Sequence, residues 1–186
     1  MRNVVKTVTA LPESYTGNVT VVINDKDDDV MVRNVIFLLL TRVENVRIAV
    51  DTILHLWYSG CLKASHQMIL KMHVRPLVAD FVEKISSKQE NAYQSKTFEL
   101  PKGMVKCVLV KRQWLKLLAT LDATHNCAKT EQARIDIVMH RQGHLDRHMF
   151  RIQHQLHQRM SIIHFKNRGV LLPFGAASED FTISNP

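Results

Sequence analysis

The spacing of apolar and polar positions predicts a short strand near the start of the chain, followed by mainly helical structure. Residues 19–23, Val-Thr-Val-Val-Ile, are an apolar run rich in β-branched side chains that ends at Asn24-Asp25, and they predict a strand. Ahead of them, Arg2 to Leu11 has apolar residues at helical spacing, and Pro12 ends that pattern. Val30 to Arg42 is apolar on nearly every side, so it predicts a buried helix.

The middle of the chain predicts more helices and a pair of short strands. Val46 to Ser59 predicts a helix whose apolar face combines several residues, namely Val46, Ala49, Val50, Ile53 and Trp57. Ser65 to Ile85 predicts a helix that Pro76 kinks or interrupts. The remaining predictions are a polar loop over 86–95, strands over 98–100 and 105–110, and a helix over 113–121.

A narrow apolar seam predicts one long helix near the end of the chain. Its residues recur at intervals of three, four and seven: Val138, Leu145, Met149, Ile152, Leu156, Met160 and Ile163. The seam suits packing within the same domain, and a coiled coil with a partner helix is the alternative. An apolar segment over 169–175 and a polar tail follow.

The strand that ends at Asp25 has the form of the second strand in a nucleotide-binding α/β unit. In such units an acidic residue at that position binds a ribose hydroxyl, and a Gly-rich turn after the first strand holds the phosphates. Neither G-x-G-x-x-G nor G-x-x-x-x-G-K-[ST] occurs in this chain. We therefore expect Asp25 to cap the following helix or to pair with Arg33, and ribose binding by Asp25 is the weaker alternative.

These patterns together predict a mostly helical α/β fold, with an incomplete Rossmann-like N-terminal unit followed by a helical region. A chain of 186 residues suits a single domain over 1–186 with a sizeable core. Its longest uninterrupted apolar run, Val35 to Leu40, is far shorter than the ~20 residues that cross a bilayer, so no membrane partner is expected. The three cysteines form no C-x-x-C pair, which favours a reducing, cytoplasmic location.

Positive charge is concentrated near the end of the chain. The formal net charge is +8, and residues 129–168 hold eight Lys or Arg against three Asp or Glu. A solvated helix face explains this distribution best, because the same span has few aromatic residues on which bases could stack. Nucleic-acid binding through a basic helix over 134–168 is the alternative.

Few residues suggest chemistry. His140, His144 and His148 recur every four residues and share one helical stripe. Two histidines at this spacing can hold zinc, but the sequence has no H-E-x-x-H, and nearby arginines would repel a cation. We therefore expect no metal site and treat these histidines as weak candidates. No G-x-S-x-G motif and no recognisable catalytic cysteine is present, so we expect no catalytic residues.

Four sequence blocks together resemble a known family. They are Arg2-Asn3-Val4-Val5-Lys6-Thr7-Val8, then Ile23-Asn24-Asp25 with residues 32–39, then Leu56-Trp57-Tyr58-Ser59, and finally residues 169–175 with Phe181 and Asn185-Pro186. In order and spacing they resemble the domain of unknown function numbered 4470. That domain occurs in fungal proteins that often carry a MYND zinc finger, and also in dynein axonemal assembly factor 3.

The resemblance implies a methyltransferase-like Rossmann start, but it supplies no catalytic residues. Family members usually have a strand and a Gly-Cys-Gly-Asp-like turn before the first block, whereas Met1 stands there in this chain. The resemblance thus implies a trimmed domain, and the chain has no cysteine and histidine array suited to a MYND finger. We expect an intracellular interaction or scaffolding domain with protein partners and no cofactor. The alternative is a degenerate or truncated methyltransferase-like domain that binds S-adenosylmethionine through Asp25.

Overall fold

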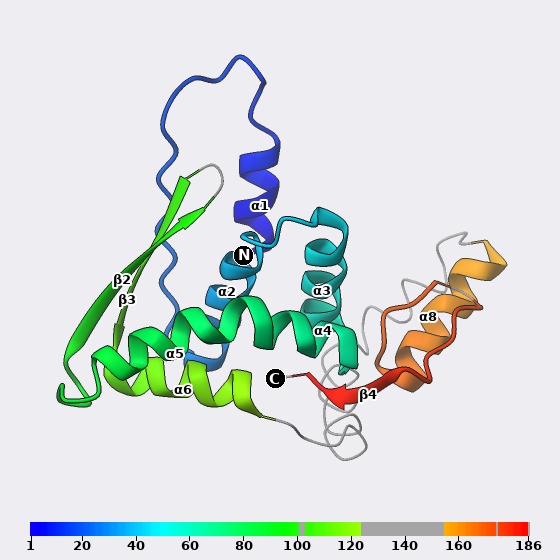
Figure 1. The fold of residues 1–186 in the computed structure, drawn as a ribbon. Coiled ribbons are helices and arrows are strands. Elements are labelled where there is room, and N and C mark those ends of the chain that lie inside the picture. The colour runs from blue at the N-terminus through cyan, green and yellow to red at the C-terminus, as the bar shows by residue number, and fades with distance from the viewer. Residues whose placement is uncertain (101–102, 124–154, 174, 186) are drawn as a thin grey trace.

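The fold combines helices with two small antiparallel sheets (Figure 1). A computed structural model describes residues 1–100, 103–123, 155–173 and 175–185. The helical elements are α1 (Arg2–Thr9), α2 (Asp28–Leu40), α3 (Val46–Tyr58), α4 (Ala64–Ile69), the π-helical segment η1 (Leu70–Val74), α5 (Arg75–Lys84), α6 (Lys111–Asp122) and α8 (Leu156–Arg168). The strands are β1 (Cys61–Lys63), β2 (Tyr93–Leu100), β3 (Gly103–Val110) and β4 (Phe181–Ser184).

Helices α2 and α3 begin at side-chain caps that the sequence provides. Asp27 accepts hydrogen bonds from the backbone N–H groups of Asp29 and Val30, at 2.8 and 3.3 Å. Asn45 accepts one from the N–H of Ile48 at 3.3 Å. Such caps satisfy backbone donors that the first helical turn leaves unpaired. The predicted buried helix over 30–42 is confirmed as α2, six of whose residues lie in the core: Val32, Val35, Ile36, Phe37, Leu39 and Leu40.

The predicted interruption of the helix over 65–85 is confirmed. Helix α4 passes into the π-helical segment η1, and α5 starts at Arg75 with Pro76 in its first turn. Proline lacks an N–H donor, so it fits a first helical turn and not a helix interior. The extra residue of a π turn accommodates this change without ending the helical path (Figure 1).

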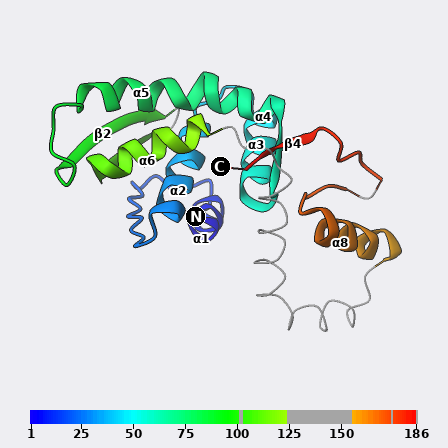
Figure 2. The same cartoon turned by 90° about the horizontal axis from the view of Figure 1, so that it is seen from below.

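The main core lies between the β2–β3 hairpin and the helices beside it. The hairpin pairs Tyr93 with Val110 and continues to Leu100 with Gly103, so both predicted strands are confirmed and β2 begins earlier than expected. Its inward side chains meet Trp114, which is fully buried and whose indole N–H donates to the carbonyl of Gln94 at 3.3 Å. Figure 2 shows α5 and α6 running alongside the hairpin, with β4 and α8 toward the other end of the molecule.

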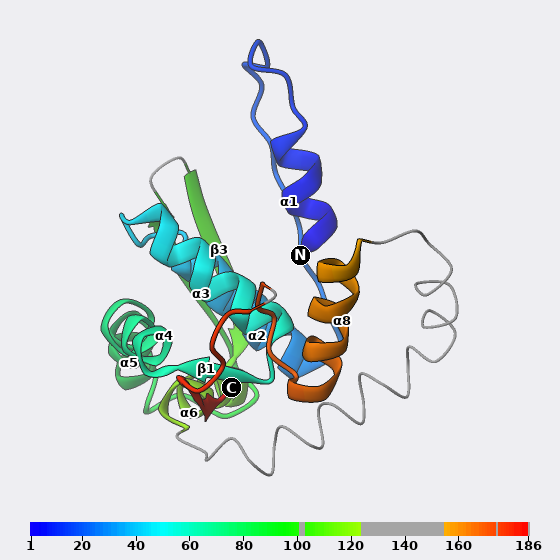
Figure 3. The ribbon, with the colours of Figure 1, turned by 90° about the vertical axis from the view of Figure 1, so that its right-hand side faces the viewer.

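The second sheet joins the end of the chain to the segment after α3. Strand β4 pairs antiparallel with β1, with Cys61 opposite Ser184 and Leu62 opposite Ile183. The N–H of Gly60 donates to the carbonyl of Gly169 at 2.6 Å, and the N–H of Asn185 donates to the carbonyl of Gly60 at 3.0 Å. The segment around Gly60, at the C-terminal end of α3, is therefore bonded to residues more than 100 positions later in the sequence (Figure 3).

The predicted strand over 19–23 is wrong. Residues 18–25 are extended, belong to neither sheet and are exposed, with Val22 at 86%. Propensity for a strand is realised only where a neighbouring strand satisfies the backbone N–H and C=O groups, and no strand of the described residues pairs with this segment. The described sheets are two-stranded and antiparallel, so the parallel sheet of a Rossmann-like unit is not confirmed.

The predicted helix at the N-terminus is confirmed as α1, which projects away from the other elements (Figures 1 and 3). Helix α8 coincides with the last part of the predicted seam helix and ends at Gly169, whose φ of 64° is left-handed. Leu156 and Met160 of the seam are exposed on it. The seam residues from Val138 to Ile152 lie outside the described residues, as does most of the basic span. Among the described helices, none has the length and apolar character that a bilayer crossing needs.

Candidate functional site

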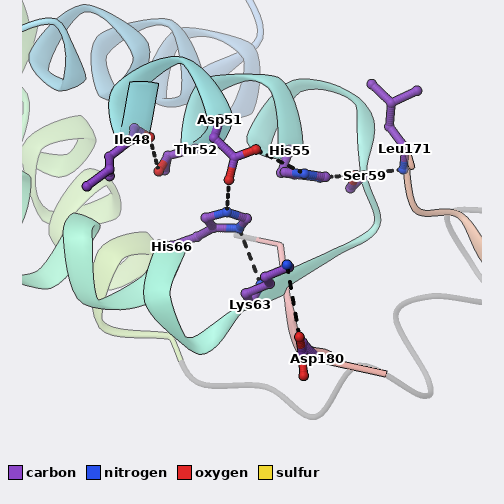
Figure 4. A network of polar contacts seen from close by, with 9 residues as sticks. All are labelled: Ile48, Asp51, Thr52, His55, Ser59, Lys63, His66, Leu171 and Asp180. Carbon is purple, nitrogen blue, oxygen red and sulfur yellow. Dashed lines mark hydrogen bonds and ion pairs between the residues drawn. The ribbon is translucent and has the colours of Figure 1, made fainter. Parts of the chain in front are cut away.

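Three side chains that can bind metals or protons converge where α3 meets α4 (Figure 4). Asp51 and His55 come from α3, one turn apart, and His66 comes from α4. One ligand atom of each lies within 4.8 Å of those of the other two. The two histidines are buried, whereas Asp51 is exposed. We call these three residues the Asp51 cluster.

The cap of α4 fixes the orientation of His66. His66 is the third residue of α4, and its Nδ1 accepts a hydrogen bond from the backbone N–H of Lys63 at 3.3 Å. Since Nδ1 accepts, the ring proton belongs on Nε2, which lies 2.8 Å from Oδ2 of Asp51 and donates to it. The short strand β1 turns the chain between the two helices and brings His66 against Asp51.

His55 is held from its other side by a serine. Its Nδ1 lies 2.9 Å from Oγ of Ser59, one turn further along α3. That hydroxyl also accepts the backbone N–H of Leu171 at 3.0 Å. The Nε2 of His55 faces Oδ1 of Asp51 at 3.6 Å, beyond ordinary hydrogen-bond length. His55 is therefore fixed through Nδ1, and its Nε2 is directed at the carboxylate.

Phe181 of β4 encloses the two imidazole rings. The rings of His55 and His66 stack with centroids 5.0 Å apart and planes inclined by 22°. The Phe181 ring lies 4.8 Å from His55 and 6.1 Å from His66. The ammonium group of Lys63 lies over the Phe181 ring, 5.1 Å from its centroid, and 4.0 Å from Asp180. The C-terminal strand thus shields the histidines from water.

This enclosure keeps His55 neutral. Burial lowers the pKa of His55 from its ordinary 6.5, and the neighbouring His66 lowers it further. Asp51 acts in the opposite direction, and Lys63 again lowers the pKa. A neutral imidazole can accept a hydrogen bond or bind a metal ion, whereas an imidazolium can do neither.

A buried asparagine anchors the end of the chain beside the cluster. The side-chain amide of Asn185 donates to three carbonyls at the C-terminal end of α3, those of His55 at 3.2 Å, Leu56 at 3.0 Å and Ser59 at 2.6 Å. The His55 carbonyl also accepts the backbone N–H of Ser59 at 2.9 Å, and the last carbonyls of a helix otherwise lack intrahelical donors, so Asn185 caps α3 from a distance of about 130 positions in sequence.

The order Asp51, His55, Ser59 along one helix invites comparison with a nucleophilic relay. Ser59 is only 2% exposed, and its oxygen accepts the Leu171 N–H. A nucleophile must reach the substrate, and this hydroxyl does not. The arrangement is therefore suited to positioning His55 and to holding a proton or a cation between His55, His66 and Asp51.

Asp25 is not part of the Asp51 cluster and has a local structural role. Its exposed carboxylate accepts the backbone N–H of Asp27 at 3.1 Å and forms a local turn. The expected capping of the next helix falls to Asp27 instead. Arg33 was expected to pair with Asp25 or Asp29. The acidic residues that raise its pKa are Asp29 and Asp27, against the larger lowering by burial.

The histidine stripe of His140, His144 and His148 lies outside the described residues. Sequence reasoning did not single out the Asp51 cluster. The spacing of Asp51, His55 and Ser59, each one turn apart on a helix, is the signal that could have found two of its three residues. His66 gave no such signal, because its place depends on the turn through β1.

Residues 1–62 match the model of a protein family described as a domain of unknown function, DUF4470. The match includes the first three of the four blocks on which the resemblance rested, and the block at 169–175 lies beyond it. It contains Asp51 and His55 but ends before His66. Neither the curated proteins nor the solved structures include a match to this chain.

Proposed function

We propose that this chain is a protein-interaction domain and that the outer face of α3 receives one helix of a partner protein. The observation that carries the proposal is a row of four large exposed side chains at intervals of four residues. They are Val46, Val50, Leu54 and Tyr58, exposed by 70%, 48%, 41% and 43%. We call these residues the α3 stripe.

The α3 stripe faces away from the core. At 100° per residue, Val50 and Leu54 lie on the side of the helix opposite Ala49, Thr52 and Leu56, which are buried. Val46 and Val50 were predicted to share one apolar face with Ala49, and their exposure corrects that prediction. Single exposed apolar residues are ordinary, but an aligned row on one helix is typical of an interaction surface.

The shape and charge of this surface favour a particular partner. A helix of 13 residues is about 20 Å long, so its row of side chains matches one partner helix laid along it. Arg47 is exposed within the width of the α3 stripe and can pair with an acidic side chain of the partner. The partner helix is therefore amphipathic, with an apolar face and acidic residues beside it.

A designed helical peptide tests this proposal. The peptide carries leucine at intervals of three and four residues, glutamate at the flanking positions and a fluorescent label. We expect saturable binding to the full chain in fluorescence anisotropy, and binding weakened about tenfold or more by Leu54→Glu, which places a charge in the α3 stripe and repels the glutamates.

Two controls make the result specific. Met104→Glu changes a side chain that is 67% exposed on β3 and should leave the affinity unchanged. A peptide with lysine in place of every glutamate should bind more weakly than the acidic one. Equal affinity of the peptide for the Leu54→Glu variant would contradict the proposal. So would a dimer of the unmodified chain that dissociates on the same substitution, because the α3 stripe would then bind a second copy of the chain.

Binding of S-adenosylmethionine is the alternative function, and a calorimetric titration of the full chain with this cofactor tests it. We expect no heat of binding from the full chain, and saturable binding at micromolar concentration would overturn an interaction-only function. A cytoplasmic location and nucleic-acid binding by residues 134–168 stay predictions.

A further inference from the structure

We propose that the Asp51 cluster binds one divalent transition-metal ion of the zinc class. The proposal goes beyond the interaction function and is independent of it, because it rests on buried side chains between α3 and α4. Two imidazoles and one carboxylate are a donor set that zinc, cobalt and iron sites use in proteins.

The distances between the ligand atoms of the Asp51 cluster are close to those around a tetrahedral metal ion. Around a tetrahedral zinc ion with bonds of about 2.1 Å, neighbouring ligand atoms are about 3.4 Å apart. Here Nε2 of His66 is 2.8 Å from Oδ2 of Asp51, and Nε2 of His55 is 3.6 Å from Oδ1 of the same carboxylate. The whole set lies within 4.8 Å, so only small side-chain movements are needed to close it on an ion.

The surroundings of His55 resemble those of a metal ligand. A histidine that binds a metal through one nitrogen usually donates the other ring N–H to a fixed acceptor. Nδ1 of His55 lies 2.9 Å from Oγ of Ser59, and the Leu171 N–H holds that oxygen in place. With its proton on Nδ1, His55 directs the lone pair of Nε2 at the carboxylate, and a cation between them removes the repulsion.

Access to the cluster is through Asp51. Its side chain is 59% exposed, whereas those of His55 and His66 are 8% and 4% exposed. An ion can therefore arrive from solvent at the carboxylate, and water completes its coordination on that side. Asp51 supplies one negative charge, and the nearby Lys63 ammonium lies close to Asp180.

Binding carries a defined cost at His66. Its Nε2 must release the proton that it donates to Asp51, and the proton moves through solvent to Nδ1. Nδ1 then no longer accepts the Lys63 N–H, so the 3.3 Å bond that caps α4 is lost. This exchange weakens the site, and it also gives a specific signature, since the Lys63 amide changes its environment when the ion binds.

Cobalt(II) absorption on the full chain, purified without an affinity tag, tests the proposal. We expect one equivalent of Co²⁺ to give a saturable visible band that Zn²⁺ removes, together with a shift of the Lys63 amide resonance in a parallel titration with Zn²⁺. Asp51→Asn should weaken Co²⁺ binding about tenfold or more, because the charged ligand is lost. Asp51 is exposed, so this variant should fold.

Two control variants locate the ion. Asp80→Asn changes another exposed carboxylate, paired with Lys84 on α5, and should leave the titration unchanged. Replacing His140, His144 and His148 together by asparagine should also leave it unchanged. The absence of a saturable band in the unmodified chain, equal affinity in Asp51→Asn, or loss of the band in the triple variant would each overturn the proposal.

Discussion

Asp51 on α3 and His66 on α4 are joined by a hydrogen bond of 2.8 Å between Oδ2 and Nε2, across 15 positions of sequence. His66 also caps its own helix through Nδ1, so one side chain links the start of α4 to the middle of α3. Strand β4 covers this junction with Phe181. The junction holds α3 in place, and α3 presents the exposed stripe proposed as the interaction surface.

Removing the amide of Asn185 should destabilise the fold. Asn185→Ala removes the buried amide that donates to three carbonyls at the end of α3, of which that of His55 keeps only the Ser59 N–H. We expect a loss of about 1–3 kcal/mol in the free energy of unfolding, measured with urea. Asn18→Ala, at an exposed position outside the helices and strands, is the matched control and should change stability by less than about 0.5 kcal/mol. Equal effects of the two substitutions would show that Asn185 does not anchor the chain.

Stability should fall as the pH decreases below about 6.5, the ordinary pKa of histidine. In the unfolded chain His55 takes up a proton near that pH, whereas in the folded chain its lowered pKa keeps it neutral. The unfolded state then binds more protons and is favoured. The loss begins at the unfolded pKa and ends below the folded one.

A variant isolates this contribution. His55→Gln removes the titrating group, so its unfolding free energy should fall less between pH of about 7.5 and about 5.5 than that of the unmodified chain. His157→Gln, at an exposed position on α8, should behave like the unmodified chain. A loss in His55→Gln as large as in the unmodified chain would assign the pH dependence to other groups.

The two acidic residues before α2 should differ in their effect on stability. Asp27→Ala removes the cap that accepts two backbone N–H groups and should cost about 1 kcal/mol. Asp25→Ala removes one hydrogen bond in an exposed turn and should cost less. Thermal or urea unfolding of both variants measures which substitution costs more stability. A larger cost for Asp25→Ala would restore Asp25 as the residue that organises this region.

The main core should depend strongly on Trp114. The side chain is fully buried, and the Phe81 ring meets it edge-on at 4.6 Å. Trp114→Ala should cost about 3–5 kcal/mol, and Trp114→Phe should cost less because most of the buried volume is kept. Leu115→Ala, at the neighbouring exposed position, is the control. If Trp114→Phe and Leu115→Ala lowered the urea midpoint equally, the core would not be centred on this indole.

Helix positions were predictable where the sequence carries local signals. The helix from Val46 was predicted to within a residue, since its apolar spacing is regular. Proline at 76 correctly marked a break. The strands β2 and β3 were predicted from short apolar runs over 98–100 and 105–110, without their antiparallel pairing. Each of these signals acts over a few residues.

Features that depend on distant partners could not be predicted. Residues 19–23 have the composition of a strand, but a strand exists only when another segment pairs with it. Strand β4 lies in a polar tail and pairs with β1 more than 100 positions away. The same applies to His66, which reaches Asp51 only through the folding of the β1 turn. The buried face of α3 was misassigned because the apolar stripe faces solvent and the inward face includes Thr52 and His55.

The most direct test of the interaction surface is a map of methyl resonances by nuclear magnetic resonance as the acidic helical peptide is added to the full chain. The account predicts shifts at the methyl groups of Val46, Val50 and Leu54, and unchanged resonances at the buried Leu62 and Val74. Shifts centred instead on the exposed segment from Val19 to Ile23, with the α3 stripe unchanged, would contradict it.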